Sequence, residues 1–199
     1  MIDFLAKIGL DKLDRALAYG VALALALALL TNSFQPDYPW ATFFVRWLHV
    51  LSGVMWIGLL WYFNFVQIPS MPKIPDEQKP AIGKVIAPTA LFWFRWAALA
   101  TLVTGLLLAM MNGYFMAAIT LTGTGPAKLI GIGMWLGIIM AYNVWMIIWP
   151  NQKIALGMVE ADADAKKKAA RTAMITSRFN TMFSIPMLYF MVGAQNIAA

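Results

Sequence analysis

The chain has 199 residues, of which 61% are hydrophobic and 12% charged, and its formal net charge is +6. Soluble domains carry about a quarter charged residues, so this balance excludes an ordinary soluble protein and indicates an integral membrane protein. Cysteine is absent, which excludes disulfides, thiolate metal sites and covalently attached c-type haem. Excess positive charge in such a protein is typical of cytoplasmic loops, so we expect no nucleic-acid partner.

The N-terminal segment, residues 1–14, combines charged residues with apolar ones such as Phe4 and Ile8. This pattern predicts an amphipathic helix lying at the membrane interface. No small-residue cleavage site follows the first apolar run, so we expect no cleavable signal peptide. Residues 15–199 are expected to form a single transmembrane bundle in the bacterial inner membrane.

Five apolar segments follow, each about 25–40 Å long as a helix, and none contains an acidic residue. They predict an all-α membrane bundle of about five transmembrane helices. The predicted spans are residues 15–32, 42–67, 87–112, 127–149 and 179–197. Pro150 is expected to end the fourth helix. Residues 115–121 are too few to cross the bilayer, so we expect them at the outer surface.

The distribution of lysine and arginine predicts the orientation. Twelve of the fifteen cations precede the first span or lie between spans two and three or four and five. Cytoplasmic loops carry the excess of positive residues, so the N-terminus is predicted inside and the C-terminus outside.

His49 is the only histidine and lies within the second predicted span. An ionisable residue inside the membrane is a functional-site hypothesis, and an imidazole there can ligate haem b, move a proton or bind an anion. One histidine excludes bis-histidine ligation within one chain, which leaves methionine as second ligand or five-coordinate haem. The methionines considered are Met55, Met134, Met140, Met182 and Met187. The alternative is a structural hydrogen bond to a neighbouring helix.

Three cations remain outside the cytoplasmic set: Arg46, Arg95 and Lys128. Arg46 shares a helix face with His49, and Lys128 follows a turn that opens the fourth span. We therefore consider Arg46, His49 and Lys128 as candidates for an anion site at the outer boundary. The alternative is that Arg46 and Lys128 reach to lipid headgroups. Arg95 either reaches toward the inner surface or pairs with a haem propionate or another anion.

Polar and small residues in the spans predict helix packing. Asn143 and Asn180 are expected to hydrogen-bond across helices, and Gly133 with Gly137 allows close approach within the chain or in a homo-oligomer. Paired carboxylates, a metal-ligand spacing and a phosphate-binding loop are absent from the sequence, so we expect no metal site.

Four short stretches, in this order, resemble signatures of the membrane domain of the urate oxidase N-terminal family. They are RWLHV at 46–50 followed by WIG at 56–58, WFRW at 93–96 followed by TG at 104–105, residues 143–153 ending in WPNQK, and SRFNT at 177–181 followed by IPM at 185–187. The resemblance spans most of residues 42–193. It implies that six residues occupy family motif positions: Arg46, His49, Arg95, Asn143, Asn151 and Asn180.

The resemblance also implies a function. In that family the membrane domain is associated with urate oxidation and often precedes a periplasmic cytochrome c domain that accepts electrons. The present sequence has no such domain and no cysteine to attach its haem. In addition, the fourth stretch usually carries a histidine before its asparagine, and this chain has Phe179 there.

The first functional hypothesis is a redox-related membrane subunit that uses His49 with haem b, assisted by Arg95, and passes electrons to a separate cytochrome c. The second is a non-catalytic accessory subunit of a larger membrane complex. The third is an anion-binding or transport module built on Arg46, His49 and Lys128. These alternatives, including whether the protein is an enzyme, remain open at the level of sequence.

Overall fold

The computed structural model describes residues 6–7 and 9–197, and in that part of the chain helices joined by short loops are present without any strand. The chain divides into two compact units, residues 1–43 (the N-terminal unit) and residues 44–199 (the C-terminal unit). Each unit is described by itself below.

The N-terminal unit consists mainly of α2 (Leu13–Leu30), an Ala/Leu helix, and the first turns of α3 (Tyr38–Trp61). The hydroxyl of Thr31 donates to the carbonyl of Leu27 at 2.8 Å and closes the end of α2. The amphipathic helix predicted for residues 1–14 falls partly on residues 1–5 and 8, which lie outside the described residues. Residues 9–12 form a turn, and α2 begins directly after them.

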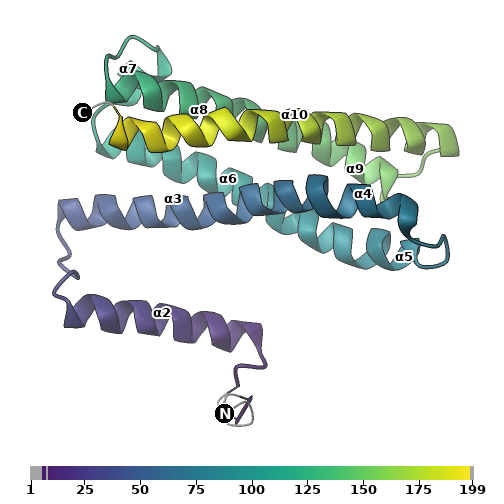
Figure 1. Ribbon diagram of the computed structural model, residues 1–199, viewed down its shortest axis with the longest axis horizontal. Helices are drawn as coiled ribbons and strands as arrows, with labels where there is room; N and C mark the ends of the chain where they lie inside the picture. The colour runs from purple at the N-terminus through teal and green to yellow at the C-terminus, as the bar shows by residue number, and fades with distance from the viewer. Residues whose placement is uncertain (1–5, 8, 198–199) are drawn as a thin grey trace. The chain divides into compact units, whose positions relative to one another are not determined.

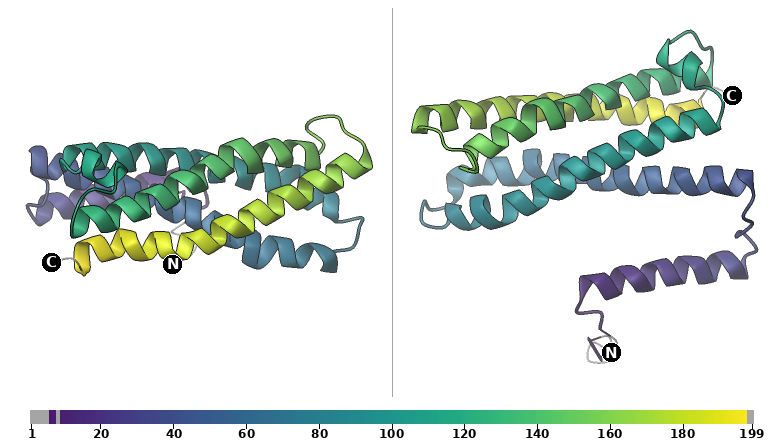
Figure 2. Two further views of the ribbon diagram at one scale, coloured as in Figure 1. Left: turned by 90° about the horizontal axis from the view of Figure 1, so that it is seen from above. Right: turned by 180° about the vertical axis from the view of Figure 1, so that it is seen from behind.

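The C-terminal unit is built from four helical rods that run alternately up and down (Figures 1 and 2). The first rod joins α3 to η1 (Tyr62–Gln67), α4 (Ile68–Ser70) and η2 (Met71–Lys73); the second joins α5 (Lys79–Ala81), η3 (Ile82–Ile86) and α6 (Ala87–Met111). The third joins α8 (Pro126–Tyr142), η4 (Asn143–Ile148) and α9 (Trp149–Ala155), and the fourth is α10 (Ala163–Asn196). The short α7 (Phe115–Ile119) lies at the end of the unit where α6 meets α8, as expected for a segment too short to span.

Three of the rods contain a π-helical turn that ends two residues before a proline. The turns η1, η3 and η4 precede Pro69, Pro88 and Pro150, respectively. A proline lacks an amide N–H and its ring collides with the carbonyl four residues earlier, whereas a π-turn widens the helix locally. The wider turn accommodates the ring, and the helix continues. The prediction that Pro150 ends the fourth helix is therefore wrong, since α9 carries it on to Ala155.

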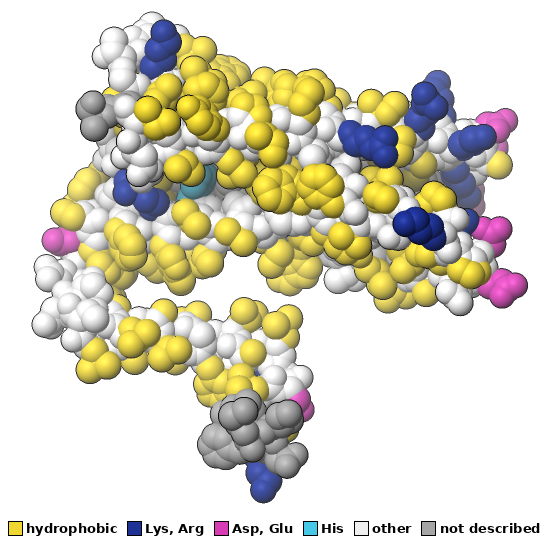
Figure 3. Space-filling model, viewed as in Figure 1, with side chains coloured by type: hydrophobic (Ala, Val, Ile, Leu, Met, Phe, Trp, Pro, Cys, Tyr) yellow, Lys and Arg dark blue, Asp and Glu magenta, His cyan; other side chains and the backbone are white. Residues whose placement is uncertain are grey.

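Four helices of the described residues are long and apolar enough to cross a membrane by length and composition: Leu13–Leu30, Tyr38–Lys73, Lys79–Met111 and Pro126–Ala155. These rods extend the predicted spans at one or both ends. Charged side chains gather at the end of the C-terminal unit that carries the α4–α5 and α9–α10 turns, and apolar side chains cover the length between the ends (Figure 3). The fifth span over 179–197 and the N-in, C-out orientation stay predictions.

The outer half of α10 has its polar residues inside and its apolar residues outside. Asn180 and Ser184 are fully buried, while Ile185, Tyr189 and Val192 are each about 60% exposed. This polarity is the reverse of that in a water-soluble helix and is favourable where hydrocarbon surrounds the bundle.

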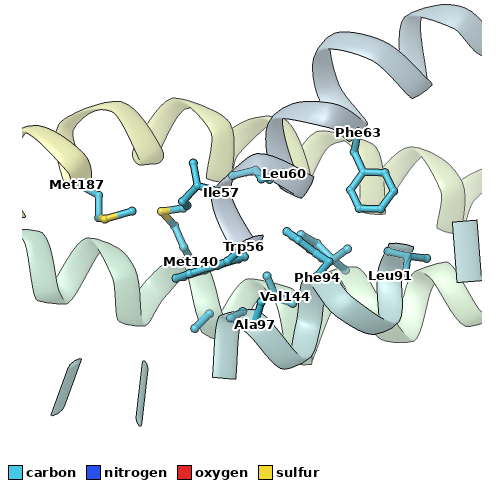
Figure 4. Packing of buried hydrophobic residues seen from close by; sticks show 13 residues of the cluster. Trp56, Ile57, Leu60, Phe63, Leu91, Phe94, Ala97, Met140, Val144 and Met187 are labelled. Atoms are coloured by element: carbon cyan, nitrogen blue, oxygen red, sulfur yellow. The ribbon is translucent and has the colours of Figure 1, made fainter. Parts of the chain in front are cut away.

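The core of the C-terminal unit lies midway along the rods. Trp56 and Leu60 of α3 pack with Phe94 of α6 and Met140 of α8, and all four are at most 2% exposed (Figure 4). Large side chains from α3 thus fill the space between this helix and the others.

Candidate functional site

His49 projects from α3 toward α6. Its Nδ1 lies 3.0 Å from the carbonyl oxygen of Thr101 and 3.2 Å from the hydroxyl of Thr104. The ring rests on Gly105, where a β-carbon would lie 2.9 Å from His49 Cε1. Because a carbonyl oxygen only accepts hydrogen bonds, Nδ1 carries the proton of the neutral ring and Nε2 keeps its lone pair.

A cavity of about 50 Å³, here called the outer cavity, lies beside this histidine. Residues from α3, α6, α8 and α10 line it, and the two predicted haem ligands Met134 and Met187 are among them. Small-ligand pockets begin at roughly 300 Å³, so the outer cavity is too small for a porphyrin ring. The histidine is oriented as in a metal ligand, but the closed packing around it does not fit haem b.

Arg46 lies near the outer loop and not beside a second cation. Its positive charge lowers the pKa of Tyr114, whose burial raises that pKa by a larger amount. The Nε atom of Arg46 is buried without a hydrogen-bond partner. Lys128, in the first turn of α8, is exposed. The anion site expected of Arg46, His49 and Lys128 stays a prediction.

Arg95 stacks on aromatic rings instead of meeting His49. Its guanidinium carbon lies 3.9 Å from the ring centroid of Trp149 and 5.4 Å from that of Phe92. Arg95 is ten residues before Gly105, which corresponds to about 15 Å along α6. A group held by His49 would not reach it directly, so the predicted pairing of Arg95 with a haem propionate at that histidine does not fit this fold.

The two predicted interhelical asparagines meet in the middle of the bundle. Asn143 Nδ2 donates to Asn180 Oδ1 at 2.8 Å, and Asn180 Nδ2 donates to the carbonyl of Met140 at 2.9 Å. This pair, which we call the asparagine lock, joins η4 and α8 to α10. Asn151 is different, because its amide donates only to the carbonyl of Ile147 in its own rod at 2.8 Å.

Polar contacts on either side of the asparagine lock were not predicted. Trp61 Nε1 donates to Ser184 Oγ at 3.0 Å, and Asn64 Nδ2 donates to Ser177 Oγ at 2.8 Å. Together with Asn180, the two serines form a buried polar face of α10 with spacings of three and four residues. That helical spacing of Ser177, Asn180 and Ser184 was the signal in the sequence that could have predicted this face.

A much larger cavity of about 580 Å³ lies toward the end of the unit that carries the α4–α5 and α9–α10 turns, and we call it the inner cavity after the predicted orientation. Most of its wall is apolar and includes the rings of Phe63 and Phe94. Its polar residues are Gln67, Gln152, Ser177 and Arg178, and no acidic residue is among the described residues that line it. The Oε1 atom of Gln67 is buried without a hydrogen-bond partner. A large apolar cavity with a few converging polar groups is the usual form of a small-molecule site.

Comparison with known protein families finds a match in the C-terminal part of the chain. Residues 118–197 match the family model described as Urate oxidase N-terminal. Over this segment the chain is similar to the urate oxidase N-terminal family. Searches among characterised proteins and among solved structures return no significant match.

The urate oxidase N-terminal segment covers α8, η4, α9 and α10, and thus the asparagine lock, Asn151 and three polar residues of the inner cavity, Gln152, Ser177 and Arg178. His49, Arg46 and Arg95 precede it, so their assignment to family motifs stays a prediction.

Phe179, at the position where the family was expected to carry histidine, points away from the bundle core. It is 40% exposed and its ring lies 4.2 Å from that of Phe183, centroid to centroid. The α10 residues beside the outer cavity are Met187 and Met191, about 12–18 Å further along the helix. A histidine at position 179 would therefore not pair with His49 within this fold.

Proposed function

We propose that this membrane protein of the urate oxidase N-terminal family binds a small planar heterocycle of the urate class in its inner cavity. The observation that carries the proposal is the cavity itself, which is in the size range of small-ligand sites and is the larger of the two described here. The family match supports urate as the first ligand to test.

The chemistry of the wall complements such a ligand. Gln67 Oε1 is a buried acceptor without a donor, and an acceptor in this state costs free energy that a ligand N–H group recovers. Arg178 supplies a positive charge, and Gln152 supplies both a donor and an acceptor. The rings of Phe63 and Phe94 offer apolar surface to a planar molecule. Urate carries N–H donors, carbonyl acceptors and a negative charge on one flat ring system.

The proposal assigns ligand binding to this chain and the acceptance of electrons to a partner. The chain spans the bacterial inner membrane with the cation-rich end inside, which places the inner cavity on the cytoplasmic side. It holds the heterocycle, and another subunit of a membrane complex, which brings its own redox group to this end of the bundle, accepts the electrons and passes them to a separate cytochrome c. Haem b at His49 is not part of this proposal, because the outer cavity does not accommodate it.

Urate binding to the protein in nanodiscs, measured by isothermal titration calorimetry, tests the proposal. Arg178→Gln is expected to weaken binding by about tenfold or more, since a hydrogen bond to a charged group contributes about 1.5–3 kcal/mol. Arg171→Gln is the matched control, because Arg171 is an exposed arginine of the same helix outside the cavity wall. Gln67→Leu should also weaken binding. Absence of urate binding to the wild type, or equal losses in Arg178→Gln and Arg171→Gln, would refute the proposal.

A further inference from the structure

We propose that the outer cavity is a binding site for the soft monovalent ion Cu(I), with His49, Met134, Met187 and Met191 as ligands. These four side chains come from α3, α8 and α10 and line one cavity of about 50 Å³. Imidazole and thioether groups are the donors that Cu(I) prefers. This inference is independent of the heterocycle proposed for the inner cavity.

The histidine is held as metal-ligating histidines usually are. Such residues donate their second ring N–H to a backbone carbonyl, which fixes the tautomer and the ring orientation. Here Nδ1 lies 3.0 Å from the carbonyl oxygen of Thr101, and the bare α-carbon of Gly105 allows the ring to approach α6. The arrangement leaves Nε2 as the ring nitrogen with a free lone pair.

The three methionines pack in the core and also border the outer cavity: Met187 and Met134 belong to the two buried apolar clusters, and Met191 packs against both. Met134 and Met187 are 8% and 6% exposed, and Met191 packs against the backbone of Gly133. Buried methionines usually fill gaps in a core. These three also border space that remains unfilled, and they do so together with the protein's single histidine.

The remaining wall favours an ion of low charge. No carboxylate lies among the described residues of the wall, and apart from His49 the side chains are Trp56, Thr101, Leu102 and Ile138, with glycines between them. The cost of burying an ion rises steeply with its charge, so neutral soft ligands in an apolar site disfavour divalent ions such as Zn²⁺ and suit a monovalent one. Trp56 adds an aromatic surface that attracts cations.

The test is anaerobic titration of the protein in nanodiscs with tetrakis(acetonitrile)copper(I), in competition with bicinchoninate. The wild type is expected to retain one Cu(I) per chain, with nitrogen and sulfur scatterers in its X-ray absorption spectrum. Because the chain has no cysteine, sulfur scatterers identify methionine. Zn²⁺ is expected not to compete.

The double variant Met187→Leu/Met191→Leu is expected to weaken Cu(I) binding by more than about 100-fold, since loss of even an outer partner of a ligand costs 10–100-fold. His49→Gln should remove the nitrogen scatterer. Leucine conserves the volume of methionine, so the double variant should fold, which its unfolding temperature verifies.

Met182→Leu is the matched control, because Met182 lies on the same helix and is 58% exposed away from the cavity wall. It should bind Cu(I) like the wild type. No stoichiometric uptake by the wild type, or uptake that survives the double variant, would overturn the proposal; the second result would assign the ion to exposed methionines.

Discussion

Substitutions in the asparagine lock are expected to lower the free energy of unfolding by amounts that show which hydrogen bonds join α10 to the third rod. Interhelical hydrogen bonds in membranes contribute about 0.6 kcal/mol on average and at most about 1.7 kcal/mol. Asn143→Leu removes one such bond, so its expected cost is about 0.6–1.7 kcal/mol. Asn180→Leu removes two bonds, to Asn143 and to the carbonyl of Met140, and its expected cost is about 1.2–3.4 kcal/mol.

The two variants share one hydrogen bond, so the double variant should cost less than their sum by about 0.6–1.7 kcal/mol, the value of that bond. The free energy of unfolding in mixed detergent micelles is the measurement. Asn151→Leu is the matched control, because the amide of Asn151 bonds only within its own rod. Additive effects of Asn143→Leu and Asn180→Leu, or a control as destabilising as Asn180→Leu, would refute the assigned connectivity.

Three further changes test local features of the fold. Gly131→Ala would place a methyl group 2.6 Å from a carbonyl oxygen of α7. We therefore expect a loss of about 1–3 kcal/mol in unfolding free energy and faster proteolysis of the outer loop. A variant as stable as the wild type would contradict this packing. Asp162→Ala removes the side-chain cap that accepts from the Ala165 amide at 2.7 Å, and thermal unfolding should report a loss of about 1 kcal/mol. Arg46→Gln removes the charge that lowers the pKa of Tyr114. Deprotonation of this phenol, followed by ultraviolet difference spectroscopy against Tyr114→Phe, should therefore move to higher pH, and an unchanged titration would separate the two residues.

The helical fold was predictable because apolar length and charge placement are local properties of the sequence. Four apolar helices, the short surface helix and the meeting of Asn143 with Asn180 agree with the predictions. The π-turns were not predicted, because a proline ordinarily signals the end of a helix. The sequence alone does not show that each of three rods widens into a π-turn before its proline and then continues.

The candidate sites were harder to predict because their partners are distant in sequence or are backbone atoms. The partner of His49 is the carbonyl of Thr101, 52 positions later, and every residue has such a carbonyl. The inner cavity arises where four rods meet, and side-chain size along any one rod gives no sign of it.

The layer between the two cavities bears on the transport hypothesis. Along the first rod the outer cavity ends at Trp56 of α3 and the inner cavity begins at Phe63 of η1, a separation of about 10 Å. Leu60, Asn180 and Ser184 fill this layer and are fully buried. A solute passing between the cavities must displace these side chains and break the asparagine lock, so this conformation does not conduct it. Transport would need a second conformation in which α3 separates from α10. The filled layer therefore favours the proposed binding role at the inner cavity over passage of a ligand through the bundle.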